Sequence, residues 1–385
     1  MNLIFISTEE YPDQHAAAIR NTTIVQGIVE AGHNVNFLLL SPQNWDTSEI
    51  NYKGIPFKAL NDYKGKSKIL REWNFFKSIL KLKKEINSRS AIDAVIIYAI
   101  EISIIRFTFL LCKKKGIKVF HERTELPFIG CENESFIGKM KYNYYINRLI
   151  PRFDGIFVIS DKLQEFFFPL NKKIKKILTV VDTNFFNAKL NSAFDFQYIA
   201  YCGTMSGDKD GIPILIQSFA KLTQQFPFHK LLLIGNNPDT DSFKNLILII
   251  EKLGIKEKIV FTGSVDRDEM PRLLANAELL VVSKPDNVQN SANFPIKIGE
   301  YLSTGVPVVV TKVGEIPKFI TDGVNGFLAS PNSVESFYAK MYEALSDYDR
   351  AKQVGYNGRV LAQSVFDYKI QSEIMLGCIK ENLNK

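Results

Sequence analysis

The sequence lacks most of the features that mark secreted, zinc-binding and membrane-spanning proteins. Its four cysteines are scattered along 385 residues without a CxxC pair, which argues against a disulfide framework and against a zinc site. No apolar run approaches the roughly 20 residues that a membrane-spanning helix needs. The first residues contain no basic segment followed by a long apolar stretch, so they do not resemble a secretory signal. These absences predict a cytoplasmic protein.

Nucleotide-cofactor, metal and nucleic-acid signatures are also missing. No GxGxxG follows the first apolar run, Leu3–Ser7, so a dehydrogenase is disfavoured. DxD triplets occur at Asp208–Asp210, Asp239–Asp241 and Asp266–Asp268, but three hits suggest chance, and Asp241, Asp266 and Asp268 stand where a helix N-cap is expected. We therefore predict no metal site. The chain is basic, with a net charge of +7, yet it contains no recognised nucleic-acid-binding module, and we expect no nucleic-acid partner.

Short apolar runs alternate with helical stretches along nearly the whole chain. This alternation predicts an α/β fold with parallel sheets covered by helices. Continuously apolar runs, such as Leu231–Ile234, indicate strands that are buried on both faces. The expected strands are Leu3–Ser7, Asn34–Leu40, Ala94–Ala99, Lys118–Glu122 and Gly155–Ser160 in the first half, and Gln197–Gly203, Lys230–Gly235, Lys258–Gly263, Leu279–Ser283 and Pro307–Thr311 in the second.

The length is typical of two domains. The two series of strands are separated near Val181–Phe186, which a polar stretch follows. We predict two Rossmann-like, doubly wound domains, one over residues 1–180 and one over residues 187–364, with a helix over residues 367–385 packing back on the first. Ligands of such sheets bind beyond the carboxyl ends of the strands, so the loops that follow strands are the places to search for chemistry.

Two strand-to-helix loops in the second half are candidates for anion binding. In the loop Gly203–Gly211, glycines allow backbone N–H groups to approach an anion and Lys209 supplies a cation; an ordinary turn with a solvated lysine is the alternative. In Ser291–Tyr301, the amides of residues 294–296 could meet a phosphate. Glu300 offers two acceptor oxygens to the vicinal hydroxyls of a ribose, although most helical glutamates simply face solvent.

A third candidate is the segment His121–Pro127 at the end of a first-half strand. A lone histidine is more often structural than catalytic. Here His121 is followed by Glu122, Arg123 and Glu125, and clusters of titratable groups that line a cleft are candidates for function. Both interpretations stay open on the sequence.

At these residues the chain resembles glycosyltransferase family 4, retaining enzymes of the GT-B fold, in which two Rossmann-like domains face each other across a cleft. The resemblance covers almost the full length, and it depends on the joint order of motifs that are modest singly. Beside the Gly203–Gly211 loop, these motifs are Ala31–Val35, Val181–Phe186, Phe294–Tyr301 ("FPxKxxEY") and Asp322–Leu328 ("DGxNGFL").

The resemblance implies roles for individual residues. Lys209 would neutralise the donor diphosphate, Glu300 would bind the ribose hydroxyls and His121 would contact the donor sugar near its reacting carbon. The implied donor-binding residues are Gly203, Thr204, Ser264, Val265, Asn293, Phe294, Pro295, Ile296, Lys297 and Glu300. On the acceptor and phosphate side the implied residues are Ala16, Ala17, Arg20, Glu122 and Arg123.

The sequence departs from the family pattern in four places, one of which is Lys209, which stands one position earlier than in the commonest spacing. Ala292 stands where the family often has a first glutamate that touches the donor sugar, and Thr204 replaces an arginine of the phosphate loop. The family's glycine-rich N-terminal loop is here Gln14–Arg20, where alanines restrict φ more than glycines do.

The implied function is metal-independent transfer of a hexosyl group from a UDP- or GDP-linked sugar to a glycan or lipid-linked acceptor, in bacterial surface polysaccharide synthesis. The nucleotide sugar is a co-substrate, and no further cofactor is expected. No carboxylate is clearly placed for double displacement, so we favour same-face attack assisted by the departing phosphate. The alternatives are a nucleotide-sugar epimerase of the same fold and a non-catalytic module that binds a sugar nucleotide or a partner.

The segment Lys64–Arg89 contains nine basic and two acidic residues. It predicts an amphipathic helix over Gly65–Ser88, with basic residues on one face and an apolar stripe on another. One interpretation is a helix packed on the first sheet. The other is reversible docking onto an anionic membrane surface, which would place the protein peripherally at the inner face of the membrane. The stripe consists of Ile69, Leu70, Trp73, Phe76 and Leu80, and the basic face of Lys77, Lys81 and Lys84.

Overall fold

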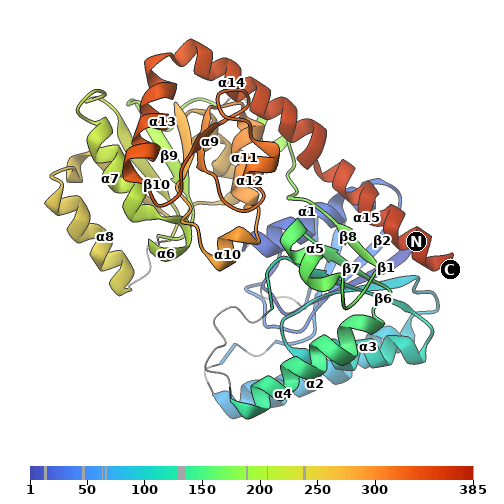
Figure 1. Cartoon of the computed structure of the whole chain (residues 1–385). Helices are drawn as coiled ribbons and strands as arrows, with labels where there is room; N and C mark the ends of the chain where they lie inside the picture. The colour runs from blue at the N-terminus through green and yellow to red at the C-terminus, as the bar shows by residue number, and fades with distance from the viewer. Residues whose placement is uncertain are drawn as a thin grey trace. The chain divides into compact units, whose positions relative to one another are not determined.

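The computed structural model describes residues 1–12, 15–45, 48–62, 64–65, 67–127, 135–187, 190–205, 207–236 and 240–384, with the backbone alone for residues 68, 187, 207 and 208. It divides into two compact units (Figure 1). The first consists of Met1–Val180 with Tyr368–Lys385, and the second of Val181–Asp367. Each unit contains one sheet with helices packed against it.

The sheet of the first unit has eight strands in the order β3-β4-β2-β1-β5-β6-β7-β8. All neighbours are parallel except β3 and β4, which form an antiparallel hairpin. The strand order reverses between β1 and β5, as in doubly wound folds. The strands are β1 (Asn2–Ser7), β2 (Asn34–Leu39), β3 (Glu49–Tyr52), β4 (Ile55–Ala59), β5 (Ala94–Tyr98), β6 (Lys118–Arg123), β7 (Gly155–Val158) and β8 (Ile174–Lys176).

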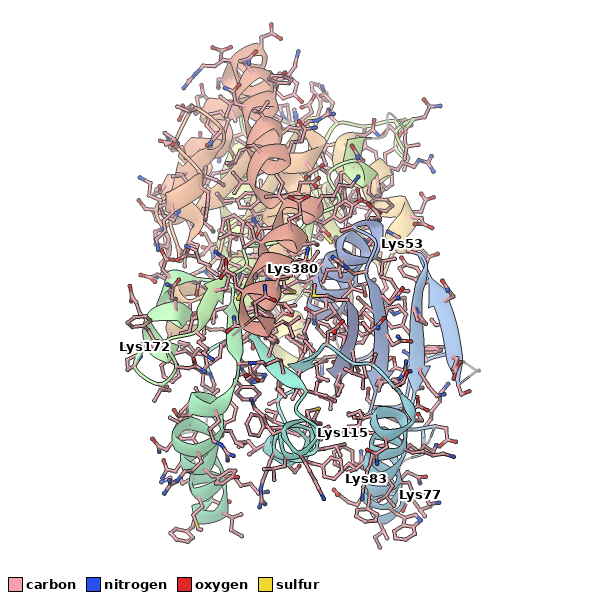
Figure 2. All side chains as sticks on the ribbon, turned by 90° about the vertical axis from the view of Figure 1, so that its right-hand side faces the viewer. Lys53, Lys77, Lys83, Lys115, Lys172 and Lys380 are labelled. Atoms are coloured by element: carbon pink, nitrogen blue, oxygen red, sulfur yellow. The ribbon has the colours of Figure 1, made fainter. Side chains whose placement is uncertain are left out.

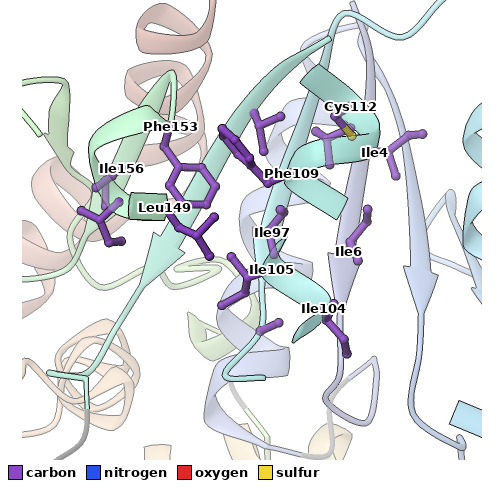
Figure 3. Close-up of a cluster of buried hydrophobic side chains, with 14 of the residues drawn as sticks. Ile4, Ile6, Ile97, Ile104, Ile105, Phe109, Cys112, Leu149, Phe153 and Ile156 are labelled. Atoms are coloured by element: carbon purple, nitrogen blue, oxygen red, sulfur yellow. The ribbon is translucent and has the colours of Figure 1, made fainter. Parts of the chain in front are cut away.

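Successive side chains of these strands pack alternately into two cores, one on each face of the sheet. In β1, Ile4 and Ile6 belong to the core shown in Figure 3, whereas Leu3 and Phe5 belong to the core on the other face. The first core is covered by α2 (Lys68–Ser88), α3 (Ile102–Lys114) and the segment after α4 (Phe136–Tyr144), and the second by α1 (Ala16–Glu30) and α15 (Tyr368–Leu383). The remaining helical elements are η2 (Tyr145–Leu149), η3 (Ile150–Arg152) and α5 (Asp161–Phe167).

The sheet of the second unit has six strands, all parallel, in the order β11-β10-β9-β12-β13-β14. The order reverses between β9 and β12, which makes the carboxyl ends of these two strands the expected ligand position. The strands are β9 (Tyr198–Cys202), β10 (Lys230–Ile234), β11 (Ile259–Gly263), β12 (Leu279–Val282), β13 (Val308–Thr311) and β14 (Phe327–Ala329).

Helices follow or precede every strand of this second sheet. They are α6 (Gly207–Asp210), α7 (Ile212–Leu222), α8 (Asp241–Lys252), α9 (Met270–Ala275), α10 (Val288–Ser291), α11 (Ile296–Thr304), α12 (Ile316–Phe319), α13 (Val334–Ser346) and α14 (Tyr348–Leu361), with short helical turns η4 (Phe185–Asn187), η5 (Lys256–Lys258), η6 (Arg267–Glu269) and η7 (Ala362–Phe366). The predicted fold class, with two doubly wound parallel sheets, is confirmed.

Every predicted strand is present within one or two residues, but four further strands were not predicted. The β3–β4 hairpin turns at Lys53 and Gly54, both with positive φ. Polar and apolar residues alternate only weakly in its first strand, Glu49–Tyr52. The strands β8 and β14 have three residues each. Short edge strands carry too little periodic signal to be recognised locally.

Cys112, Cys202 and Cys378 form no disulfide within the described residues, and Cys131 lies outside them. Within the described ranges no helix is both long and apolar enough to cross a bilayer. The aspartate at residue 241 is the first residue of α8 rather than its cap, because the hydroxyl of Thr240 accepts the capping hydrogen bond from the amide of Phe243.

Close packing of α15 on α1 depends on one glycine. A Cβ atom added at Gly27 would lie 2.4 Å from Ser372 Oγ and 2.9 Å from its Cβ, whereas one added at Gly377 would meet nothing within 4 Å. We predict that Gly27→Ala lowers the free energy of unfolding by about 1–3 kcal/mol. Gly377→Ala, the matched control in α15, should raise it by up to about 1 kcal/mol. Equal effects of the two variants in urea unfolding would contradict this packing.

Candidate functional site

The loop after β9 contains two glycines against which neighbouring groups pack closely. A Cβ at Gly203 would lie 2.3 Å from Tyr201 Oη and 2.5 Å from Lys297 Nζ, so two polar side chains come directly against its backbone. At Gly211, where φ is +65°, a Cβ would lie 2.1 Å from the carbonyl oxygen of Ser283. This contact brings the start of α7 against the residues that follow β12, at the reversal of strand order.

A buried carboxylate, Asp210, binds three side chains from different elements at this point. Its Oδ1 lies 2.8 Å from Lys284 Nζ, and its Oδ2 lies 2.5 Å from Lys297 Nζ and 2.6 Å from Tyr201 Oη. Lys284 follows β12, Lys297 belongs to the first turn of α11 and Tyr201 to β9. Asp210 therefore ties the ends of two central strands to the N-terminus of a helix.

The charges in this cluster perturb each other. Burial would by itself raise the pKa of Asp210, but the ammonium groups of Lys297 and Lys284 outweigh burial and hold this pKa well below its usual range. Burial lowers the pKa of Lys284, and the charge of Asp210 opposes that shift. The carboxylate thus stays ionised and keeps cations close to the strand ends.

Hydrogen bonds from Asn290 and Ser283 connect the surrounding loops. Asn290 accepts from Lys284 Nζ at 3.0 Å and donates to the carbonyl oxygens of Lys209 and Pro285. The Ser283 hydroxyl donates to the carbonyl oxygen of Gly211 at 2.8 Å. The glycine loop and the loop after β12 are therefore one hydrogen-bonded structure. The sequence motifs do not include Lys284, Asn290 or Tyr201; the apolar run that ends at Ser283 indicates only that a strand ends there.

Glu300 does not face solvent, so the interpretation of a solvated helical glutamate is wrong. Its side chain is buried in α11, and Oε1 lies 2.6 Å from Arg267 Nη2. The guanidinium of Arg267 lies 5.3 Å and 5.2 Å from the ring centroids of Phe185 and Phe186. The contact between Glu300 and Arg267 is an ion pair without hydrogen-bond geometry, and Oε1 receives no hydrogen bond from the described residues.

The other predicted donor residues fall into two groups. The side chain of Phe294 packs on Phe319 and Phe366 in the core, so only its backbone can meet a ligand. Pro295 is the N-cap of α11, whose first free N–H groups belong to Ile296 and Lys297. Thr204, Lys209, Ser264, Val265 and Asn293 are exposed or half-buried after β9, β11 and β12. Ala292, which stands in place of the family's first glutamate, is buried and has no polar group that could bind a sugar.

In the first unit, His121 is fully buried, contrary to the prediction that it faces a cleft. Its Nδ1 lies 2.9 Å from the carbonyl oxygen of Ile97, which can only accept, so Nδ1 donates and Nε2 accepts from the Tyr145 hydroxyl at 2.9 Å. Burial lowers the pKa of His121 to about 3, with a further contribution from Arg123. A neutral ring with both nitrogens engaged contacts a sugar only if the bond to Tyr145 opens.

The predicted acceptor-side residues Arg20 and Glu122 are used inside the fold. Arg20 Nε donates to Glu122 Oε1 at 3.0 Å, and its Nη atoms donate to the carbonyl oxygens of Ile177 and Leu178. Both side chains are almost fully buried, and burial raises the pKa of Glu122 although Arg20 opposes the shift. A role for them at an acceptor is not supported by these contacts, which join α1, β6 and the chain after β8.

The other residues assigned to the acceptor side are more accessible. Ala16 and Ala17 open α1 and are exposed and half-buried, while Gln14 lies outside the described residues. Arg123 is half-buried, and its Nη1 lies 3.4 Å from the carbonyl oxygen of Ala99. In the described part of the chain no group of histidine, cysteine, aspartate and glutamate is arranged to hold a metal ion.

Comparison with known proteins adds a family match to this geometry. Residues 182–361 match the model of the family glycosyl transferases group 1. Similar proteins include N-acetyl-alpha-D-glucosaminyl L-malate synthase of Bacillus anthracis, 26% identical over 40% of this chain and 36% of that protein, and lipopolysaccharide 1,2-N-acetylglucosaminetransferase of Salmonella typhimurium, 28% identical over 47% of each. The chain thus spans less than half the length of these relatives.

Solved structures match nearly the whole chain. Sucrose-phosphate synthase from Thermosynechococcus elongatus superposes with a TM-score of 0.78 at 16% identity, covering 99% of this chain and 98% of the other. Anabaena Alr3699/HepE in complex with UDP-glucose has a TM-score of 0.73 at 18% identity, covering 100% and 99%. At these identities the likeness establishes the fold, which is that of the GT-B glycosyltransferases.

Loss of the Asp210 carboxylate should destabilise the second unit. We predict that Asp210→Asn lowers the free energy of unfolding by about 3–5 kcal/mol, because it leaves the ammonium of Lys284 buried beside no carboxylate. Adding Lys284→Met, which removes that charge and keeps the volume, should recover most of the loss. Chemical unfolding of the single and double variants measures both effects. Additive losses in the double variant would show that the pair is not coupled.

Proposed function

Because residues 182–361 of this chain match the model of the glycosyl transferases group 1, we propose that the protein is a retaining glycosyltransferase. It would move a hexosyl group from a nucleoside diphosphate sugar to a hydroxyl of a glycan or lipid-linked acceptor. One relative transfers N-acetylglucosamine in lipopolysaccharide and another is GDP-mannose-dependent, while a structural neighbour has been solved with UDP-glucose. These names support a UDP- or GDP-linked donor and a place in bacterial surface polysaccharide synthesis.

The observation that carries the proposal is the charge cluster beyond β9 and β12. The ammonium groups of Lys284 and Lys297 both contact the single carboxylate of Asp210, so these three side chains carry one more positive charge than negative. The first amides of α11 point their free N–H groups out of the same helix end that carries Lys297. A diphosphate has the charge and the acceptor oxygens that such a site lacks.

Glu300 supports the same kind of ligand through its nucleoside part. Its Oε1 is buried and receives no hydrogen bond from the described residues, although Arg267 balances its charge. A carboxylate has two oxygens and several lone pairs, so that of Glu300 keeps acceptor capacity beyond its contact with Arg267. The hydroxyl groups of a ribose are donors of the right kind, and a bound nucleotide would use that capacity.

The reaction is a displacement at the anomeric carbon. The bond between that carbon and the diphosphate oxygen breaks, and its electron pair stays on the diphosphate. Lys297 and the N-terminus of α11 would stabilise the charge that develops there, without reorganising during the step. The acceptor oxygen attacks from the same face and forms the new glycosidic bond, and its proton passes to the departing phosphate. Fixed cations of the chain would provide this stabilisation without a metal.

Binding of nucleotide sugars to the purified protein tests the proposal. We expect one class of nucleotide sugar to bind, and we expect Lys297→Met and Glu300→Gln each to weaken binding about 10- to 100-fold, the loss of one hydrogen bond to a charged group. Isothermal titration calorimetry with a panel of UDP- and GDP-sugars measures this. Lys352→Met removes an exposed lysine of α14 and should leave the affinity unchanged.

The same panel separates the alternatives. Conversion of a bound sugar to its epimer without any acceptor would replace the transferase by an epimerase. Tight binding without transfer or hydrolysis would favour a binding module, consistent with Ala292 in place of a glutamate. Absence of binding by a folded protein would refute the assigned site.

A further inference from the structure

Helix α2 carries two apolar faces, and only one of them is packed. Leu82 and Ile86 are buried in the first core, with Phe75 and Ile79 packed beside them. The predicted stripe points elsewhere: Ile69 is 81% exposed, Trp73 55% and Phe76 52%. The helix does pack on the first core, as one interpretation of the sequence expected, but through residues other than this stripe.

A second helix of the same layer, α4, has the same property. None of its residues is buried, and Phe136, Ile137 and Met140 are 78%, 64% and 57% exposed. In Figures 1 and 2 the beginnings of α2 and α4 both lie at the lower end of the first unit, with α3 between the two helices in Figure 2. The exposed side chains of the two helices thus occur at one end of one unit.

Lysines border the exposed stripe of α2. By helical spacing, Lys77, Lys81 and Lys84 lie along one side of it and Lys83 along the other; Figure 2 labels Lys77 and Lys83. All four side chains are exposed, as are Lys139 and Lys141 on α4. Of the two acidic residues in α2, Glu85 is paired with Lys58 and Arg89, and Glu72 is exposed, so the lysines remain in excess.

The combination identifies the kind of partner. Large apolar and aromatic side chains bordered by lysines are the pattern of helices that lie in the interface of an anionic bilayer, with rings at the headgroup boundary and ammonium groups on phosphates. Protein interfaces, by contrast, are depleted of lysine. Trp73 and Lys77 also lie close together, with Nζ 5.6 Å from the ring centroid, so one residue pair presents both chemistries.

We propose that α2 and α4 together form a docking surface for an anionic lipid bilayer. The apolar side chains enter the interface, and the lysines bind the headgroup phosphates. The surface lies entirely in the first unit, and it includes α4, which the sequence did not single out. The proposal goes beyond sugar transfer and is tested without any sugar donor, so either proposal can fail while the other holds.

Vesicle binding tests it directly. The full chain should sediment with vesicles in which a third of the lipid is phosphatidylglycerol, and hardly with phosphatidylcholine alone. Replacing Lys77, Lys81 and Lys84 by glutamine should lower the partition coefficient on the order of 100-fold, at about fivefold for each lysine. Replacing Lys244, Lys252 and Lys256 of the second unit by glutamine changes the net charge equally and should have little effect.

The apolar half of the surface has its own measurement. Trp45 and Trp73 are the two tryptophans, so in Trp45→Phe the fluorescence reports on Trp73 and should shift to the blue on anionic vesicles. Phe136→Ser with Ile137→Ser should weaken binding about tenfold or more, whereas Phe228→Ser, an equally exposed phenylalanine of the second unit, should not.

Three results would overturn the proposal. The first is equal binding of both kinds of vesicle. The second is unchanged binding in a folded lysine or α4 variant. The third is self-association in sedimentation velocity that depends on Trp73, together with no vesicle binding, since this would assign the surface to a second copy of the chain.

Discussion

The ionised carboxylate of Asp210 is the contact on which the candidate site depends. Two ammonium groups and a tyrosine hydroxyl meet on its two oxygens, and each comes from a different element of the second unit. Without that charge, Lys284 could not stay buried next to the strand ends. The carboxylate therefore stabilises the fold and also shapes the candidate site. It holds cations at the reversal of strand order, where a doubly wound sheet binds its ligands.

The first unit uses similar residue types in the opposite way. Arg20 donates to Glu122 and to backbone carbonyls, and the two ring nitrogens of His121 bond the backbone of Ile97 and the hydroxyl of Tyr145. The two cases differ in their balance of charge. Around Asp210 the cations are in excess, so the cluster can bind a further anion. Arg20 and Glu122, by contrast, neutralise each other within the core. Titratable residues at a strand end thus do not identify a site until their partners are known.

Helix α2 shows a related limit for apolar patterns. Helical spacing identified its exposed stripe correctly as a set, but the stripe was equally compatible with packing and with exposure. The helix packs through Phe75, Ile79, Leu82 and Ile86 instead. With two apolar faces on one helix, the face that meets the sheet depends on how the helix is placed by the strands on either side of it, and that placement lies outside the helix's own sequence.

The sequence alone determined the fold class, the long buried strands and the loops in which the site should be sought. These features are local: an apolar run of four to six residues or a glycine after a strand is visible without knowing its neighbours. The short strands β3, β4, β8 and β14 were not visible, because pairing rather than pattern defines them. Only the tertiary structure joined Asp210 to Lys284 and Lys297, 74 and 87 residues away, since such contacts depend on which strands become neighbours in the sheet.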